Sequence, residues 1–174
     1  MSQQPGNIIL VGPMGAGKSA VGRQLARTLD KDFVDSDDEI EARTGVDIPF
    51  IFEKEGEPGF RDRETRVLED IAARSGIVLA TGGGAVMRAE NRATLAGCGF
   101  VVYLQTSVDQ QLSRTSRGRH RPLLDTDDPR AVLESLMHKR HPLYEELADL
   151  VVDTNGRKVS SVVQEIRERL DEAL

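Results

Sequence analysis

The stretch Gly12-Pro13-Met14-Gly15-Ala16-Gly17-Lys18-Ser19 decides the fold of this chain, because it matches the pattern G-x-x-x-x-G-K-[ST] between a strand-like and a helix-like run. The run before it, residues 7–11, is short, branched and apolar, which predicts a strand buried on both faces. After it, apolar residues recur every four positions and predict a helix over residues 18–29. A glycine-bent turn between two such elements presents backbone N–H groups and a helix N-terminus, so the stretch predicts a phosphate-binding loop.

The same pattern assigns chemistry to two side chains of the loop. Lys18 is placed to reach the β- and γ-phosphates of a nucleotide, and the Ser19 hydroxyl is placed to ligate Mg²⁺. The alternative is a chance glycine-rich turn with an exposed lysine. The flanking strand and helix disfavour that alternative.

Composition predicts one compact domain, because 174 residues suffice for one core and are short for two. The first six residues are polar and no apolar run approaches membrane-spanning length, so we expect a cytoplasmic protein without a membrane partner. The net charge of −6 argues against a nucleic-acid surface. The aromatic content of 4% offers no obvious hydrophobic interface, which favours a monomer. The single cysteine, Cys98, fits a reducing compartment and is assigned no chemistry.

Strand-like and helix-like runs alternate without a linker or repeat, which predicts an α/β fold with a parallel sheet wrapped by helices. Helices are expected before Gly76, from Ser107 to about residue 117 with Ser107 and Gln110 as a capping box, and over residues 159–170. Five strands are expected, at residues 7–11, 33–35, 77–80, 100–104 and 150–152. Ligands of such sheets lie beyond the carboxyl ends of the strands.

The acidic tripeptide Asp35-Ser36-Asp37 follows the second expected strand. In an extended segment, residues two apart point to the same face, so both carboxylates are expected to line one site. A phosphoryl transferase needs one acid near the metal and benefits from another that orients the attacking hydroxyl; Asp35 suits the first role and Asp37 the second. A solvated acidic turn is about as good an interpretation of the local sequence, and the position after a strand favours the site modestly.

A run of glycines, Thr81-Gly82-Gly83-Gly84, directly follows the third expected strand. Three glycines let the backbone approach a ligand closely and present unshielded N–H donors. The alternative is a flexible turn, but such a run costs conformational entropy that a ligand-facing loop would justify.

Two arginines and one basic segment are candidates for binding anions. Arg61 and Arg140 could grip a carboxylate or phosphate in bidentate fashion if they converge, although each taken singly is more often a surface residue. The segment 117–121 concentrates positive charge around a glycine, which is typical of a closing lid that brings an arginine to a transferring phosphoryl group. Its alternatives are an ordinary basic loop and a nucleic-acid patch, which would need interleaved aromatic residues.

Taken together, these motifs closely resemble those of the shikimate kinases of the bacterial aromatic pathway, over residues 7–169. The resemblance rests on GPMGAGKS from Gly12, DSD from Asp35, GFRDRE from Gly59, TGGG from Thr81, RPLL from Arg121 and RHPLY from Arg140. It implies a three-layer P-loop kinase fold with a central five-stranded parallel sheet flanked by helices. It also implies a single domain over residues 1–174, with an acceptor-binding region at 33–61 and a mobile lid at 112–125.

The resemblance also implies residue roles. Asp35 belongs beside the metal with Ser19, Asp37 binds the hydroxyls of shikimate and is a candidate base, and Arg61 and Arg140 bind its carboxylate. The implied substrate-binding residues are Asp37, Arg61, Gly82, Gly83 and Arg140, and the implied catalytic residues are Lys18, Asp37 and Arg121. The implied ATP-binding residues are Gly15, Ala16, Gly17, Lys18, Ser19, Ala20, Arg114, Arg121 and Arg157.

The implied reaction is the transfer of the γ-phosphoryl group of ATP to the 3-hydroxyl of shikimate, with Mg²⁺ as cofactor. Two alternatives stay open within kinases, a gluconate kinase and an adenylate kinase, and the DSD, GFRDR and RHPLY motifs argue against both. A nucleotide-dependent switch is the alternative outside enzymes. A guanine-specific N-K-x-D motif is absent from the sequence, and a switch would have no use for an acceptor pocket.

Overall fold

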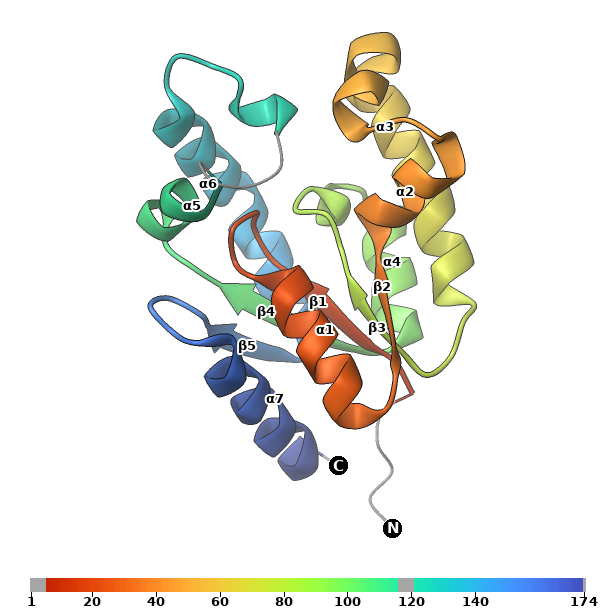
Figure 1. Ribbon diagram of the computed structural model, residues 1–174, viewed down its shortest axis with the longest axis vertical. Coiled ribbons are helices and arrows are strands. Elements are labelled where there is room, and N and C mark those ends of the chain that lie inside the picture. The colour runs from red at the N-terminus through yellow and green to blue at the C-terminus, as the bar shows by residue number, and fades with distance from the viewer. Residues whose placement is uncertain (1–5, 116–120, 174) are drawn as a thin grey trace.

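The computed structural model describes residues 6–115 and 121–173, and its centre is a five-stranded parallel sheet in the order β2-β3-β1-β4-β5 (Figure 1). The strands are β1 (Ile8–Val11), β2 (Asp32–Asp35), β3 (Ile77–Ala80), β4 (Phe100–Gln105) and β5 (Leu150–Asp153). Each lies within one residue of its expected range, so the predicted five-stranded parallel sheet is confirmed.

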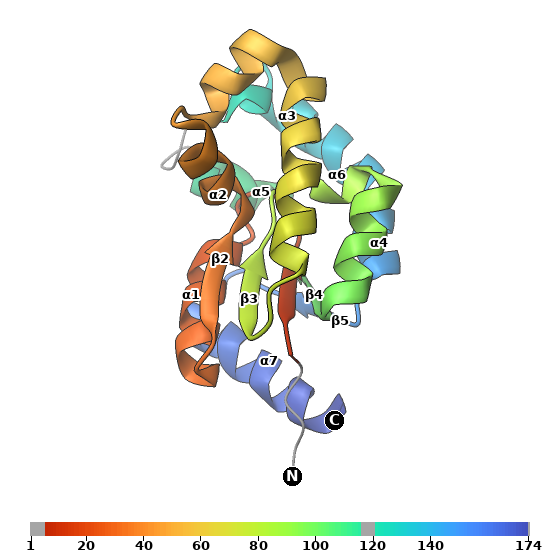
Figure 2. The same cartoon turned by 90° about the vertical axis from the view of Figure 1, so that its right-hand side faces the viewer.

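Helices cover both faces of the sheet, which gives the three layers (Figures 1 and 2). One face is covered by α1 (Lys18–Leu29) and α7 (Val159–Ala173), which pack on Ile8 and Leu10 of β1. The other is covered by α3 (Ile48–Ala72), α4 (Ala89–Cys98) and α6 (Pro129–Leu147), which pack on Ile9 and Val11. Successive residues of β1 therefore enter opposite cores, because side chains alternate across a strand. A strand with apolar residues at every position fits only such a doubly covered sheet.

The helix predictions agree in part with the structure. The expected helix over residues 18–29 is α1, the expected C-terminal helix is α7, and the apolar residues before Gly76 lie at the end of α3. The helix α5 (Val108–Thr115) begins as expected, with the Gln110 amide donating to Ser107 Oγ at 3.1 Å. The second hydrogen bond of the predicted capping box, from the Ser107 amide to the Gln110 side chain, is wrong. The Gln110 side chain instead accepts from Gly156 N and donates to Thr154 O.

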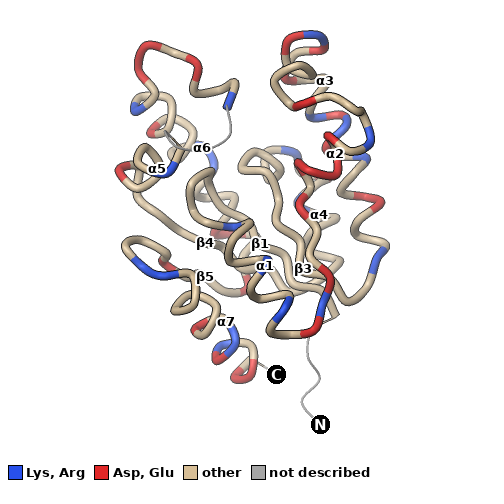
Figure 3. Tube along the Cα trace, in the orientation of Figure 1, with Lys and Arg blue, Asp and Glu red and all other residues tan. Residues whose placement is uncertain are grey.

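Three helices were not predicted from the sequence: α2 (Ser36–Thr44), α4 and α6. Their apolar periodicity is weak, because α2 buries only Ser36 and Ile40 and α6 carries Pro142 in its interior. Helix α3 is also longer than predicted, and it bends at Gly56, where φ is 72°. Charged residues of both signs occur along α3 (Figure 3), which leaves little apolar pattern on its outer face.

The carboxyl ends of β1, β2 and β3 meet at one edge of the sheet, as expected for parallel strands. Of the two short 3₁₀ helices, η1 (Ala85–Met87) follows the glycine loop at the end of β3, and η2 (Pro122–Leu124) lines the same pocket as that loop. In Figure 1, α2 and α3 rise on one side of the edge, and α5, α6 and η2 rise on the other. Among the described residues, no helix is both long enough and apolar enough to cross a lipid bilayer.

Candidate active site

The phosphate-binding loop leaves the end of β1 and closes over the start of α1. Gly15 and Gly17 adopt φ values of 80° and 92°, which favour glycine over any L-residue with a side chain. Lys18 lies back across the loop, and its Nζ donates to Gly12 O at 2.6 Å and to Pro13 O at 2.8 Å. Burial and the charge of Arg121 lower the pKa of the Lys18 ammonium to about 7. The loop therefore holds a desolvated cation close to a second one, an arrangement that a bound polyphosphate would stabilise.

The two residues predicted beside the metal are in direct contact. Ser19 Oγ donates to Asp35 Oδ2 at 2.7 Å, while Asp35 Oδ1 accepts from the amides of Asp37 and Asp38. A hydroxyl and a carboxylate are hard oxygen donors, which Mg²⁺ prefers, and Mg²⁺ usually takes only one or two protein ligands beside waters and phosphates. The pair therefore fits this ion. No larger set of three or more His, Cys, Asp or Glu side chains with metal-site geometry occurs in the described parts of the chain.

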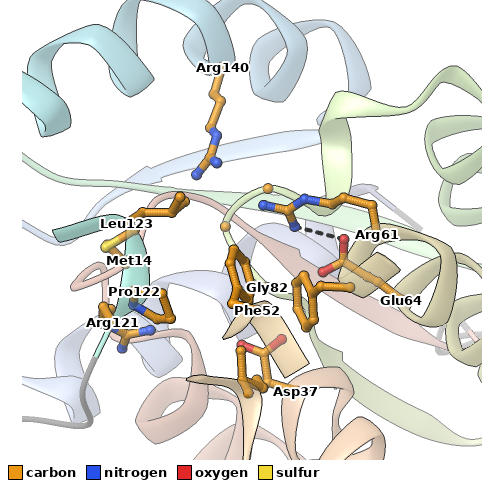
Figure 4. Close-up of a pocket in the computed structure, with 14 residues that line it drawn as sticks. Met14, Asp37, Phe52, Arg61, Glu64, Gly82, Arg121, Pro122, Leu123 and Arg140 are labelled. Atoms are coloured by element: carbon orange, nitrogen blue, oxygen red, sulfur yellow. Dashed lines mark hydrogen bonds and ion pairs between the residues drawn. The ribbon is translucent and has the colours of Figure 1, made fainter. Parts of the chain in front are cut away.

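The extended geometry expected for Asp35 and Asp37 is wrong, although both side chains face the site. Asp35 ends β2 and caps α2, so the chain turns into a helix at Ser36 and Asp37 lies in its first turn. The Asp37 Oδ1 atom is buried and has no hydrogen-bond partner among the described residues. Burial first, and then the neighbouring Glu64 and Asp35 charges, raise the pKa of Asp37 to about 7. Asp37 is thus a carboxyl group that titrates near neutral pH and points into a pocket (Figure 4).

Two adjoining pockets meet at Asp37. The first, the nucleotide pocket, is lined by residues of the phosphate-binding loop together with Asp35. The second, the acceptor pocket, is lined by Arg61 from α3 and Arg140 from α6, which enter it from different directions (Figure 4). The residues that line both pockets are Met14, Asp37, Gly82, Gly83 and Arg121. A group could therefore pass from one pocket to the other between Asp37 and Arg121.

The glycine loop after β3 is shaped by the side chains around it. A Cβ on Gly82 would lie 2.9 Å from both Asp37 Oδ1 and Glu64 Oε2, and one on Gly84 would overlap the Arg61 guanidinium. On Gly83 a Cβ would lie 3.3 Å from Arg140 Nη1. Each glycine therefore leaves room for a charged group of the acceptor pocket, and the predicted ligand-facing loop lines both pockets.

Both predicted acceptor arginines are nearly buried, at 8% exposure for Arg61 and 4% for Arg140. Arg61 Nη1 donates to Glu64 Oε1 at 2.9 Å, and Arg61 Nη2 pairs with Glu57 at 3.3 Å. Burial lowers the pKa of the Arg140 guanidinium. The sequence analysis missed Glu64, which is fully buried and lines the acceptor pocket. Its position three residues after Arg61 on a helix was the available signal, because such pairs lie on one face.

The predicted ATP-side residues are only partly brought together. Gly15, Gly17, Lys18, Ser19 and Ala20 line the nucleotide pocket, as do Arg114 and Arg121. Ala16 is buried and does not line it, and neither does Arg157.

Arg157 instead donates to Asp153 O at 2.9 Å and pairs with Glu165 of α7 at 2.8 Å. The neighbouring Thr154 does reach the phosphate-binding loop, through a hydrogen bond from its Oγ1 to Ala16 O at 3.0 Å. The sequence analysis did not single out Thr154.

Helix α5 is hydrogen-bonded to the phosphate-binding loop through two side chains. Arg114 Nη1 donates to Gly15 O at 3.0 Å, and the buried Gln111 donates to Met14 O at 2.9 Å. The predicted lid, residues 112–125, is described at 112–115 and 121–125, whereas Arg117 and its neighbours up to residue 120 lie outside the described residues. Arg121, directly before η2, lies close enough to Lys18 to lower its pKa.

These pockets define a class of protein. A phosphate-binding loop with a metal-side carboxylate, next to a pocket in which a carboxyl group faces two buried arginines, is the site of a P-loop kinase that acts on a small, hydroxylated anion. The shikimate kinase family model matches residues 14–171 of the chain. The chain therefore belongs to the shikimate kinase family, a family of ATP-dependent kinases, which decides against the gluconate kinase, adenylate kinase and switch alternatives.

Similar proteins agree with this assignment over nearly the whole chain. A shikimate kinase of Thioalkalivibrio sulfidiphilus is 64% identical over 94% of this chain and 86% of its own length. One of Pseudomonas entomophila is 60% identical over 95% of this chain and 96% of its own. Among solved structures, a shikimate kinase from Acinetobacter baumannii in complex with shikimate is 50% identical, with a TM-score of 0.94, covering 97% of this chain and 94% of that one.

Proposed function

We propose that this member of the shikimate kinase family transfers the γ-phosphoryl group of ATP to the 3-hydroxyl of shikimate, giving shikimate 3-phosphate and ADP in the biosynthesis of aromatic amino acids. The observation that carries the proposal is the junction of the two pockets at Asp37 and Arg121. On one side lies a loop suited to polyphosphate, and on the other lies a pocket suited to a hydroxylated carboxylate. Shikimate, a carboxylic acid with ring hydroxyls, has both features that the acceptor pocket selects.

The acceptor is held at two ends. Arg61 and Arg140 grip its carboxylate, because two buried guanidinium groups that face one pocket require an anion between them. Asp37 accepts a hydrogen bond from the reacting hydroxyl, and the backbone of Gly82 and Gly83 contacts the acceptor. Phe52 and Phe60, whose ring centroids are 4.9 Å apart, line the same pocket and offer its apolar surface.

The nucleotide is held by the loop backbone, with Lys18 moving from its own loop carbonyls to the β- and γ-phosphates. Ser19 and Asp35 would hold Mg²⁺, which would supply neutralising charge to the phosphates. Arg114, on α5, flanks the adenine, and Arg121 approaches the γ-phosphoryl group that is transferred. Ala20, which lines the nucleotide pocket, is a further contact. Ala16 is buried and could contribute only its backbone, and Arg157, which does not line the pocket, would first have to leave Glu165.

In the chemical step, the bond between the γ-phosphorus and the bridging oxygen of ATP breaks as the shikimate 3-oxygen bonds to phosphorus. The hydroxyl proton leaves toward the Asp37 carboxylate. Because the transition state of phosphoryl transfer is loose, positioning and charge neutralisation carry most of the acceleration. Asp37 therefore mainly orients the hydroxyl, and Lys18 and Arg121 neutralise the charge that develops on the phosphoryl group and on ADP.

We further propose a monomeric cytoplasmic enzyme made of one domain over residues 1–174, with acceptor binding at 33–61 and a lid at 112–125. The low aromatic content and the mixed charges along the exposed helices support the monomer (Figure 3). Sedimentation at working concentration checks the oligomeric state.

The experiment that tests the reaction is ADP release from MgATP with shikimate, with gluconate, AMP and no acceptor as parallel samples. We expect ADP release to depend on shikimate and to stop when Mg²⁺ is chelated. Equal release without any acceptor, or release with gluconate or AMP alone, would overturn the substrate while leaving the nucleotide pocket in place.

A further inference from the structure

One buried hydroxyl behind the acceptor pocket lies against two residues that line the pocket, Gly83 and Arg140. Tyr144 of α6 is fully buried, and its hydroxyl donates to the carbonyl of Gly83 at 2.5 Å. The Arg140 guanidinium, one helical turn earlier, lies close enough to the same hydroxyl for each group to shift the pKa of the other. A tyrosine hydroxyl has one proton to donate and lone pairs to accept with, so it can serve the carbonyl and the guanidinium together.

The middle carbonyl of the glycine loop differs from its neighbours in how it is held. Gly82 O and Gly84 O accept from the amides of Ala85 and Met87, within the turn itself. Gly83 O instead accepts from Tyr144, on a helix 61 residues further along the chain. Local backbone hydrogen bonds therefore hold the carbonyls of Gly82 and Gly84, whereas a side chain of α6 holds the carbonyl of Gly83 between them.

The ring of Tyr144 is itself immobilised, so its hydroxyl has a defined position. It packs in the core beneath the sheet, with its centroid 4.9 Å from that of Tyr103. Burial raises the pKa of Tyr144 to about 12, so the hydroxyl keeps its donor proton at neutral pH. Arg140 lies directly over this contact, since its Nη1 would be 3.3 Å from a Cβ on Gly83.

We infer that Tyr144 is a positioning residue for the acceptor: its hydroxyl holds the Gly83 backbone and the Arg140 guanidinium in the arrangement that grips the carboxylate and the ring. This inference rests on the proposed function, in which those two groups bind shikimate. Tyr144 does not act on the transferring phosphoryl group. Its loss therefore weakens binding of the acceptor in the ground state and in the transition state alike, which raises KM and leaves kcat nearly unchanged.

Tyr103 supplies a matched control. It is equally buried, its ring packs against that of Tyr144, and its hydroxyl is bonded to His141 Nδ1 at 2.9 Å, away from the glycine loop. Tyr103→Phe and Tyr144→Phe thus each remove one hydroxyl oxygen, from two buried rings that pack against each other. Only the second removes a contact of the acceptor pocket.

The test measures kcat and both KM values for the wild type, Tyr144→Phe and Tyr103→Phe. In Tyr144→Phe we expect KM for shikimate to rise about fivefold to tenfold, the size of one buried hydrogen bond, with kcat and KM for ATP within about twofold. In Tyr103→Phe all three should stay within about twofold of the wild type. An unchanged KM for shikimate in Tyr144→Phe, or an equal rise in Tyr103→Phe, would overturn the inference.

Affinity can also be measured without turnover, from the rise in unfolding midpoint that added shikimate produces in each variant. This readout remains usable if Tyr144→Phe is less stable, because each variant is compared with itself. A smaller shikimate-induced rise in Tyr144→Phe alone supports the inference, and equal rises in both variants contradict it. If the wild type shows no shikimate-dependent ADP release, the proposed function fails and takes this inference with it; if the wild type turns over and Tyr144→Phe binds shikimate normally, only the inference fails.

Discussion

The nucleotide pocket and the acceptor pocket lie side by side but are built in different ways. The nucleotide pocket takes much of its lining from one continuous stretch, residues 14–20, and uses its backbone. The acceptor pocket takes its lining from separate segments, namely α2, α3, the loop after β3, η2 and α6. A local turn determines the first, whereas only the packed fold creates the second. Substitutions in the two pockets should therefore differ in what they change: turnover itself on the nucleotide side, and selective acceptor binding on the other.

The largest effect is expected on the nucleotide side. Lys18→Ala should lower kcat about 10³-fold, because it removes a desolvated charge aimed at the transferring phosphoryl group. The fold should survive the substitution. Burial lowers the pKa of the Lys18 ammonium to about 7, which shows that its charge is poorly solvated in the folded state, and the ammonium contributes no apolar packing. Steady-state kinetics and thermal unfolding check both statements.

The partly exposed Lys31, whose Nζ donates to Gly6 O at 3.2 Å, offers the control substitution Lys31→Ala. Turnover near that of the wild type in Lys18→Ala, with unchanged stability, would remove Lys18 from the mechanism.

The next largest effect belongs to the junction between the pockets. Asp37→Asn keeps the size of the side chain but removes its capacity to accept a proton, so kcat should fall about 10²-fold. KM for ATP should change little, because the neighbouring Asp35 keeps its contact with Ser19. Steady-state kinetics with shikimate and with ATP as the varied substrate separate the two constants. A fall in kcat below about threefold would leave Asp37 as a binding group only.

The acceptor side should respond selectively. Arg61→Lys should raise KM for shikimate about tenfold and leave KM for ATP unchanged, because lysine cannot reproduce a bidentate contact. Arg63→Lys is the control, since Arg63 lies on the same helix but forms its bidentate pair with Glu55 at the surface, at 2.7 and 2.8 Å. Initial rates at varied shikimate and at varied ATP provide the comparison. Parallel rises in both KM values, or an equal response in Arg63→Lys, would place Arg61 outside the acceptor site.

The same contrast explains how much could be predicted from the sequence. The phosphate-binding loop and all five strands were predicted correctly, because short apolar runs and a contiguous glycine pattern encode them locally. Asp35 and Asp37 were expected in an extended segment, and the helix that the Asp35 carboxylate caps was missed. The local sequence alone did not show that the acidic residues after Asp35 form the first turn of a helix rather than an extended segment.

Side chains that act only through distant partners were missed altogether. Gln111 reaches Met14 across 97 residues of sequence, and Tyr144 reaches Gly83 across 61. Arg61 and Arg140 were singled out as arginines that could grip an anion if they converge, but only the resemblance assigned them to the acceptor, since a single arginine in a sequence carries no sign of its burial. Such contacts appear only once the sheet has brought α3, α5 and α6 to the ends of its strands.

The smallest effect is one on stability, and it distinguishes a buried functional carboxyl group from a surface one. Because the pKa of Asp37 is raised from 3.8 to about 7 in the folded state, the folded protein binds more protons than the unfolded chain between these values. The contribution of Asp37 to stability is therefore present at low pH and is lost as the pH rises toward 7. Asp37→Asn removes this dependence, so the variant should gain stability relative to the wild type between pH 5 and pH 7.5, by about 1–2 kcal/mol.

Urea unfolding of both proteins at the two pH values measures the difference. Asp38→Asn, whose side chain is 45% exposed in the same helical turn, controls for placing an amide there. A difference between Asp37→Asn and the wild type that does not change with pH would show that the Asp37 carboxyl group titrates alike in the folded and unfolded states. The junction of the two pockets would then be wetter than its burial indicates, and Asp37 would be ionised in the resting enzyme without help from a bound nucleotide or acceptor.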